Sequence, residues 1–146
     1  MKDRWTAYAI FRLALGVNIF IHGVVRISGS GAHDFASKTT QSFLPTLLPI
    51  WSVFAFLIVL PFVEAALGAL MALGLLTKWS LVAGSLLMVL LIFGTALRSD
   101  WATLGVQMIY SITYYLLLSH LRQNELSVDA FFLRKGRRNV GARHER

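Results

Sequence analysis

The stretch WSVFAFLIVLPFVEAALGALMALGLL, residues 51–76, decides the fold of this chain. It is long enough to cross the apolar core of a bilayer, for which an α-helix needs about 20 residues. Glu64 is its only ionisable residue. A charge at that depth costs about 3 kcal/mol on insertion scales and persists where a partner or a function stabilises it. The segment therefore predicts a membrane helix whose single acid faces other helices rather than lipid.

The composition of the whole chain agrees with a membrane protein. Of its 146 residues, 56% are hydrophobic and 14% are charged, whereas soluble domains carry about 25% charged residues. The chain has no cysteine, which excludes disulfides and thiolate metal sites formed by the chain itself. Its length suits one small domain.

Four apolar runs, at about residues 5–27, 51–76, 80–97 and 102–121, predict an all-α, antiparallel four-helix membrane bundle over residues 1–121. An even number of spans puts both termini on one side. The positive charges favour the cytoplasmic side for these termini, because Lys2, Arg4, Lys78 and seven tail residues would lie there, against Lys38 and Arg98 opposite. The pattern predicts a multi-pass membrane protein with both termini in the cytoplasm and loop 28–49 facing outward.

Two segments lie outside the predicted spans. Loop 28–49 contains a stretch bounded by Gly31 and Pro45, which is either a short amphipathic helix over the outward mouth of the bundle or an ordinary surface loop. Residues 122–146 form a basic tail, in which SVDAFFL (residues 127–133) is either an interfacial helix or a loop. A basic tail directly after a span is typical of a topology determinant near anionic lipid rather than of nucleic-acid contact.

Polar residues of the first span share a face. At about 100° per residue, Arg12, Asn18, His22 and Arg26 fall within an arc about 120° wide, which is one helix face. In lipid such a face must point into the bundle, because lipid offers no hydrogen-bond partner. The first span therefore predicts a polar lining for the interior of the bundle.

The other spans show related patterns. In the second span Glu64, Gly68 and Ala72 form a stripe, and small residues at this spacing let another helix approach closely. The remaining polar positions are Arg98, Gln107, Tyr110 and Tyr114, at the end of the third span and along the fourth.

The expected depths of these polar residues in the membrane predict a polar pocket that opens toward the outer face and has Glu64 as its floor. His22 is the expected closest ionic partner of Glu64, Arg26 the second choice, and Arg12 a weaker partner nearer the cytoplasmic side. One acid among several cations indicates an anionic or carbonyl-bearing ligand. The candidate catalytic residues are Glu64 and His22, and the candidate ligand-binding residues are Arg12, Asn18, Arg26, Arg98, Gln107, Tyr110 and Tyr114.

Structural roles remain open for the same residues. In the structural alternative for Glu64, an ion pair with one basic residue is a buried bridge that fixes helix register. A single buried histidine such as His22 is usually a core residue with a hydrogen bond. Arg26 and Arg98 also suit arginines that extend to the membrane surface, and Tyr110 and Tyr114 suit core aromatics.

The motifs of the first two spans resemble those of the DoxX family. The first span reads FRLALGVNIFIHGVVRI (residues 11–27) and the second LPFVEAALGALMALGLLTKW (residues 60–79). The resemblance covers about residues 5–121, with its specific motifs in these two spans. The residues that carry it are Arg12, Leu15, Gly16, Gly23, Arg26, Glu64, Gly68, Gly74, Thr77 and Lys78.

The resemblance implies a four-helix inner-membrane protein, since some DoxX proteins are membrane subunits of thiosulfate:quinone oxidoreductase. It implies a subunit that binds a quinone or small redox substrate and supports electron transfer to the quinone pool, with a redox partner subunit or a second copy as partner. As an enzyme it would be a quinone-linked oxidoreductase subunit without a covalent cofactor or metal. His22 and Tyr110 would donate to the quinone, Arg26 or Arg98 would stabilise negative charge, and Glu64 would relay protons.

Two other functions stay open. The first is a non-enzymatic membrane scaffold or assembly factor, in which the buried charges fix packing. The second is a small transporter, ranked third because the inverted repeat typical of secondary transporters is missing. The absence of cysteine also separates this chain from thiol-redox relatives.

Overall fold

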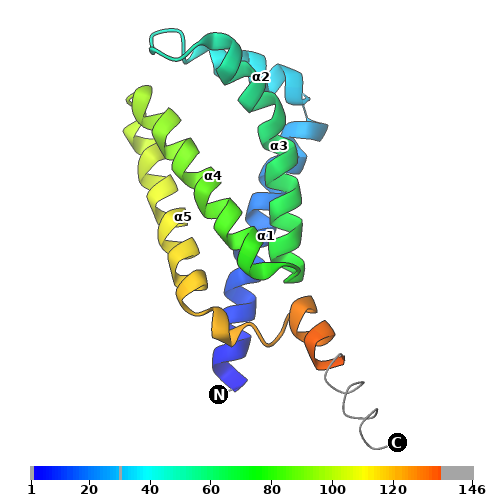
Figure 1. The fold of residues 1–146 in the computed structure, drawn as a ribbon. Helices are drawn as coiled ribbons and strands as arrows, with labels where there is room; N and C mark the ends of the chain where they lie inside the picture. Colours follow the sequence, from blue (N-terminus) through cyan, green and yellow to red (C-terminus); the bar gives the residue numbers. More distant parts are fainter. Residues whose placement is uncertain (1, 30, 136–146) are drawn as a thin grey trace, which may run out of the picture.

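The computed structural model describes residues 2–29 and 31–135, and the regular structure of these residues is helical. Figure 1 shows α1 and α4 running from the end with the N-terminus toward the end with α2, and α3 and α5 running back. Residues 128–135 form a further helical segment near the N-terminal end of α1. The named helices are α1 (Lys2–Ser28), α2 (Ala32–Gln41), α3 (Ile50–Leu73), α4 (Thr77–Leu97), α5 (Trp101–Ser119) and the 3₁₀ turn η1 (Leu121–Gln123).

Three of the described helices, α1, α3 and α4, are long and apolar enough to cross a membrane. This confirms the all-α membrane class and three of the predicted spans. α5 has 19 residues and is long enough, but its hydropathy places it outside that group. Its sequence WATLGVQMIYSITYYLLLS interrupts the apolar residues with hydroxyl and amide side chains, which lowers its hydropathy. The fourth span therefore stays a prediction.

The closest packing in the molecule joins α1 to α3. A Cβ atom added to Gly16 would lie 2.8 Å from Ala72 Cα, and one added to Gly68 would lie 2.6 Å from Phe20 Cα. A Cβ atom at Gly23 would clash with the backbone of Ala65. The two helices therefore touch backbone to backbone, as the stripe of small residues in the second span predicted.

The turn between α3 and α4 lies three residues earlier than predicted. It occupies residues 74–76 rather than 77–79. Gly74 ends α3 in the left-handed conformation (φ 69°), and its N–H and that of Leu75 bond back to Met71 and Leu70. This glycine cap ends α3 three residues before the end of the apolar run. The predicted span extended to residue 76 because Leu75 and Leu76 are apolar and carry no signal for a helix end.

The outer loop contains the short helix that the sequence offered as one of two readings. α2 begins after Gly31, whose φ is 87°, and ends at Gln41, before Pro45. Its buried Ala36 and the following Phe43 pack on Val53 and Leu57 of α3. A second core joins the four long helices through Tyr8, Leu15, Ile19, Met71, Leu81, Met88, Tyr114 and Leu117.

Figure 1 shows α3 and α4 diverging from their shared turn toward the end that carries α2. The helices associate mainly as two pairs, α1 with α3 and α4 with α5, and α3 meets α4 less extensively. The two pairs therefore separate toward the end that carries α2.

We expect Gly68→Ala to destabilise the protein, because the new methyl group forces α1 away from α3. Overpacking of this kind costs about 1–3 kcal/mol, which a thermal unfolding midpoint in detergent would show. Gly105→Ala is the matched control in α5, since a Cβ atom there meets nothing within 4 Å. That change should stabilise by about 0.5–1 kcal/mol through helix propensity. Equal stability of the Gly68→Ala and wild-type proteins would contradict the close approach.

Candidate functional site

A pocket of about 400 Å³ lies beneath α2, between α3, α4 and α5. Most of its lining is apolar and comes from α3 and α4. The polar residues that line it are Arg26, Thr39, Ser52, Thr95, Arg98, Thr103 and Gln107. Three of the predicted ligand-binding residues, Arg26, Arg98 and Gln107, therefore share one pocket.

Glu64 pairs with Arg26, not with His22. The Arg26 Nη1 donates to Glu64 Oε2, and the Glu64 side chain is only 6% exposed. His22 is exposed and has no hydrogen bond or ion pair to another described residue. The expectation that His22 is the closest partner is wrong because the buried face of α1 centres on Gly16 and Gly23. His22 falls to the side of that face, while Arg26, one turn further, reaches back over it.

Glu64 is also not the floor of the pocket. It lies behind Arg26 and is absent from the lining. The buried acid thus acts on the pocket through the arginine, by holding the Arg26 side chain in place and neutralising its charge. This corrects the predicted geometry, although it keeps Glu64 and α1 in contact, as expected for an acid that faces the bundle interior.

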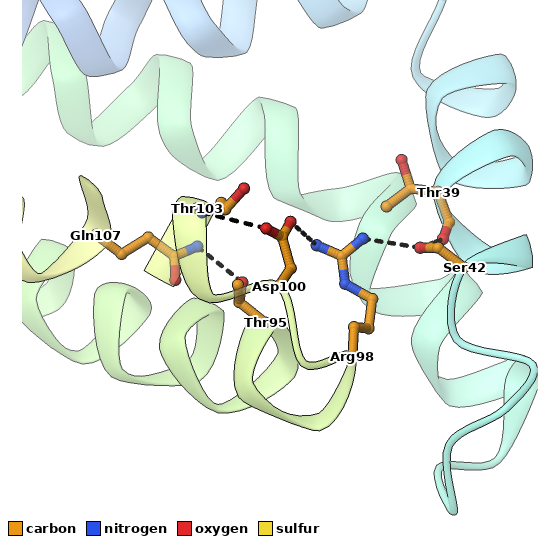
Figure 2. A network of polar contacts seen from close by, with 7 residues as sticks. All are labelled: Thr39, Ser42, Thr95, Arg98, Asp100, Thr103 and Gln107. Carbon is orange, nitrogen blue, oxygen red and sulfur yellow. Dashed lines mark hydrogen bonds and ion pairs between the residues drawn. The ribbon is translucent and has the colours of Figure 1, made fainter. Parts of the chain in front are cut away.

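Arg98 forms the centre of a polar network between α2 and the α4–α5 turn (Figure 2). Its Nη1 donates to Ser42 Oγ at 2.8 Å, and its Nη2 lies 3.5 Å from Asp100 Oδ2. Asp100 also accepts from the Thr103 N–H at 3.2 Å and so caps α5. Side-chain and backbone hydrogen bonds from Thr103, with a contribution from Arg98, hold the pKa of Asp100 below its usual value. Arg98 therefore has an acid partner that the sequence analysis did not include.

Gln107 meets the same pocket from α5. Its Nε2 donates to Thr95 Oγ1 at 2.9 Å, while its Oε1 is buried without a hydrogen bond (Figure 2). The Arg98 Nε is also buried without a partner. A buried polar atom left unpaired costs about 1–3 kcal/mol. Two residues of the pocket lining thus each carry one buried polar atom without a hydrogen bond, a donor in Arg98 and an acceptor in Gln107.

Both pocket arginines also stack on aromatic rings of the α2 region. The Arg26 guanidinium carbon lies 4.7 Å from the centre of the Phe35 ring, and that of Arg98 lies 5.0 Å from the centre of the Phe43 ring. Such cation–π contacts contribute about 0.5–2 kcal/mol each. Arg26 and Arg98 supply the positive charge of the pocket, and the same two side chains hold the α2 region over it.

The other predicted residues do not join this pocket. Tyr110 donates to Asn18 Oδ1 at 2.9 Å and links α5 to α1. Tyr114 is 2% exposed and packs its ring against Gly84 of α4. The prediction of one shared pocket for all these residues is therefore wrong, because the face of α1 that carries Asn18 is turned beside the α1–α3 contact rather than into it.

Arg12 lies at the opposite end of the molecule and contacts the tail. It is 4% exposed, and its guanidinium donates to Asn124 Oδ1 at 2.9 Å and to the Leu126 carbonyl at 3.1 Å. A Cβ atom on Gly74 would overlap this guanidinium, so the residue that ends α3 also makes room for Arg12. Arg12 is therefore separate from Glu64, in agreement with its predicted depth.

Asp129 closes this second network. Its carboxylate accepts from the Leu76 N–H at 2.8 Å and from the Thr77 N–H and hydroxyl at 2.7 and 2.8 Å. Burial raises the pKa of Asp129, but the bonds from Thr77 and Leu76 and the charge of Arg12 outweigh it, so the net pKa is lowered. Asp129 thus caps the start of α4 from a distant part of the chain.

Sequence reasoning missed Asp100, Asn124 and Asp129. Asp100 carried a usable signal, because an Asp directly before an apolar run is typical of a helix N-cap. Asn124 and Asp129 carried none, since their partners Arg12 and Thr77 are distant in sequence. Among the described residues no three His, Asp or Glu side chains gather as a metal site would require.

Stability should fall in acid because of Asp129. A carboxyl group with a lowered folded-state pKa stabilises the protein above its unfolded pKa of about 3.9, and loses that contribution as the pH falls through the folded value. We expect Asp129→Asn to cost about 1.5–3 kcal/mol at pH 7 and to flatten the decline of the unfolding midpoint between about pH 5 and 2. Asp34→Asn, at an exposed position of α2, is the control. An Asp129→Asn curve parallel to that of the wild type would refute the assignment.

Comparison with known proteins places the chain in a family. The profile of the DoxX family matches residues 7–98, which include most of α1 and all of α2, α3 and α4. No curated protein and no solved structure matches the chain significantly. The matched region contains both residues of the Arg26–Glu64 pair and extends to Arg98, so it covers more than half of the chain and most of the pocket lining. The chain is a membrane protein that belongs to the DoxX family.

Proposed function

We propose that this chain is a membrane subunit that binds a quinone, or a similar small redox substrate, in the pocket beneath α2 and supports electron transfer to the quinone pool. The observation that carries the proposal is the pocket itself, which is apolar along most of its length and carries two guanidinium groups. In the proposal the electron donor is a redox partner subunit or a diffusible molecule.

The size and polarity of the pocket suit such a ligand. Its volume of about 400 Å³ lies within the range of small-molecule sites. Phe56, Leu90 and Phe93 line it and are 36%, 55% and 56% exposed. In a bilayer these side chains face lipid, so a lipid-soluble molecule reaches the pocket from the membrane between α3 and α4.

The polar end of the pocket suits a carbonyl-bearing headgroup. A bound quinone would supply the redox chemistry by taking up electrons and protons. Arg98, which has an unpaired Nε–H, would donate to a carbonyl oxygen, and Gln107 would accept from a hydroxyl group of the reduced form. Arg26 would orient the headgroup while Glu64 balances its charge. His22 and Tyr110, which lie outside the lining, take no part in this version of the site.

The same proposal includes the membrane arrangement. α5 would be the fourth span of an antiparallel four-helix bundle in the inner membrane, with both termini in the cytoplasm and α2 at the outer surface. The support is the excess of positive charge at the end formed by the start of α1, the α3–α4 turn and residues 121–135, and the opposite directions of successive long helices in Figure 1.

A scaffold role is the second candidate. It is favoured by the Arg26–Glu64 pair, in which each charge has its partner within the protein. A buried pair of this kind can fix helix register without binding anything. Substitutions in the pocket separate the two roles. They weaken ligand binding if the pocket binds a substrate, and they leave binding unchanged if the chain is a scaffold.

We expect Gln107→Leu to weaken binding of decylubiquinone to the purified protein while leaving its thermal stability nearly unchanged. The substitution removes the bond to Thr95 but also removes the unpaired Oε1, and these changes offset one another. Arg98→Gln should weaken binding more, by about tenfold or above, because a charged donor contributes about 1.5–3 kcal/mol.

His22→Ala is the matched control for these variants, since His22 is exposed and outside the pocket lining. It should bind decylubiquinone like the wild type. If Gln107→Leu and Arg98→Gln also bind like the wild type, the pocket is structural and the scaffold role stands.

The topology is testable because the chain has no cysteine of its own. We expect a membrane-impermeant maleimide to label Gln41→Cys in α2 from outside the inner membrane. Arg4→Cys at the start of α1 should react only after the membrane is permeabilised. Labelling of Arg4→Cys in intact spheroplasts would reverse the proposed orientation.

A further inference from the structure

A second pocket, also of about 400 Å³, lies at the opposite end of the molecule from α2. It is bounded by the start of α4, by η1 and by residues 124–134. The turn beside it joins α3 and α4, two helices long enough to cross a membrane, so the pocket lies at a membrane surface. Figure 1 shows the helical segment of residues 128–135 beneath the turn between α3 and α4.

Both carboxylates that line this pocket already accept hydrogen bonds from groups of the protein. Asp129 accepts three hydrogen bonds from Leu76 and Thr77. Glu125 accepts from Arg134 Nη2 at 2.6 Å. Asp129 thus accepts from the N–H groups of Leu76 and Thr77 at the start of α4.

Two cations of the pocket keep their charge available. Lys78 and Arg122 line it, are exposed, and have no carboxylate partner among the residues that the structure describes. The Lys78 ammonium lies 5.4 Å from the centre of the Trp79 ring. Three cations against two acids leave the pocket with a net positive charge. An anionic group between Lys78 and Arg122 would supply the missing partner.

The surface around the pocket is apolar. Trp79 is 65% exposed, and Phe131, Phe132 and Leu133 are 63%, 61% and 69% exposed. Tryptophan and phenylalanine beside lysine and arginine are typical of protein surfaces at the level of lipid headgroups. A soluble anion would use only the cations, whereas a phospholipid would use the cations and the apolar side chains together.

We propose that this pocket binds the phosphate of an anionic phospholipid between Lys78 and Arg122, with the acyl chains lying along Trp79 and Leu133. The bound lipid would attach the segment of residues 128–135 to the membrane beside α4. The site is independent of the pocket beneath α2, so it stands or fails separately from the proposed function.

The test uses the full-length protein extracted in mild detergent with equal amounts of phosphatidylglycerol and phosphatidylethanolamine. Native mass spectrometry then measures which lipid stays bound. The wild type should retain phosphatidylglycerol selectively. Lys78→Gln with Arg122→Gln should lower that retention by about tenfold or more, since each basic residue near an anionic surface contributes about 1 kcal/mol, or about fivefold.

Lys2→Gln with Arg4→Gln is the matched control, because it removes the same charge from the same end of the molecule. It should leave phosphatidylglycerol retention unchanged, and the thermal midpoint verifies that each variant is folded. Equal losses in the two double variants would overturn the site in favour of general electrostatic attraction. Displacement of the lipid by equimolar inorganic phosphate would overturn the lipid assignment, because it would show that the acyl chains contribute nothing. Retention in the Lys78→Gln, Arg122→Gln protein equal to that of the wild type would also overturn it.

Discussion

The contact of α1 with α3 is the constraint on which the rest of this structure depends. Glycines on both helices, Gly16 and Gly23 on α1 and Gly68 on α3, bring the two backbones together. At this distance the register is determined, because a shift along either helix would replace a glycine with a side chain that does not fit. That register places Arg26 one turn beyond Gly23 and opposite Glu64. The glycines therefore position the buried ion pair.

The ion pair in turn shapes the pocket beneath α2. Glu64 holds Arg26 at the edge of the α1–α3 pair, and Arg98 occupies the corresponding place at the end of α4. Each arginine has an acid on one side and an aromatic ring of the α2 region on the other. The two guanidinium groups are thus held by several contacts each while they line an apolar cavity. A ligand would meet positive groups whose geometry is already established.

The opposite end of the molecule satisfies buried polar groups in another way. Arg12 has carbonyl oxygens of the tail as its partners, and Asp129 has backbone N–H groups of the turn before α4. These bonds attach residues 124–129 to α1 and to the junction of α3 and α4. The polar groups of the tail segment are therefore part of the fold, and Lys78 and Arg122 remain for other partners.

The sequence by itself determined the helical membrane class, the position of three spans, the presence of a buried acid and the small-residue stripe of α3. These follow from local patterns, since apolar run length and residue spacing act within one helix. The short helix α2 and the helical segment at 128–135 were also readable, as one of two alternatives, from their amphipathic sequences.

The tertiary structure alone decided which polar residues meet. The predicted face of α1 was defined by its polar side chains, but the buried face is centred on glycines, because the helix turns to whichever side allows the closest packing. With α1 rotated in this way, Glu64 pairs with Arg26 and His22 is exposed. The partners of Arg12, and the Ser42 partner of Arg98, come from segments far away in the chain, so no spacing in the sequence could reveal them. A polar residue in a sequence indicates that a partner is needed, and only the packing of the helices determines which partner is near.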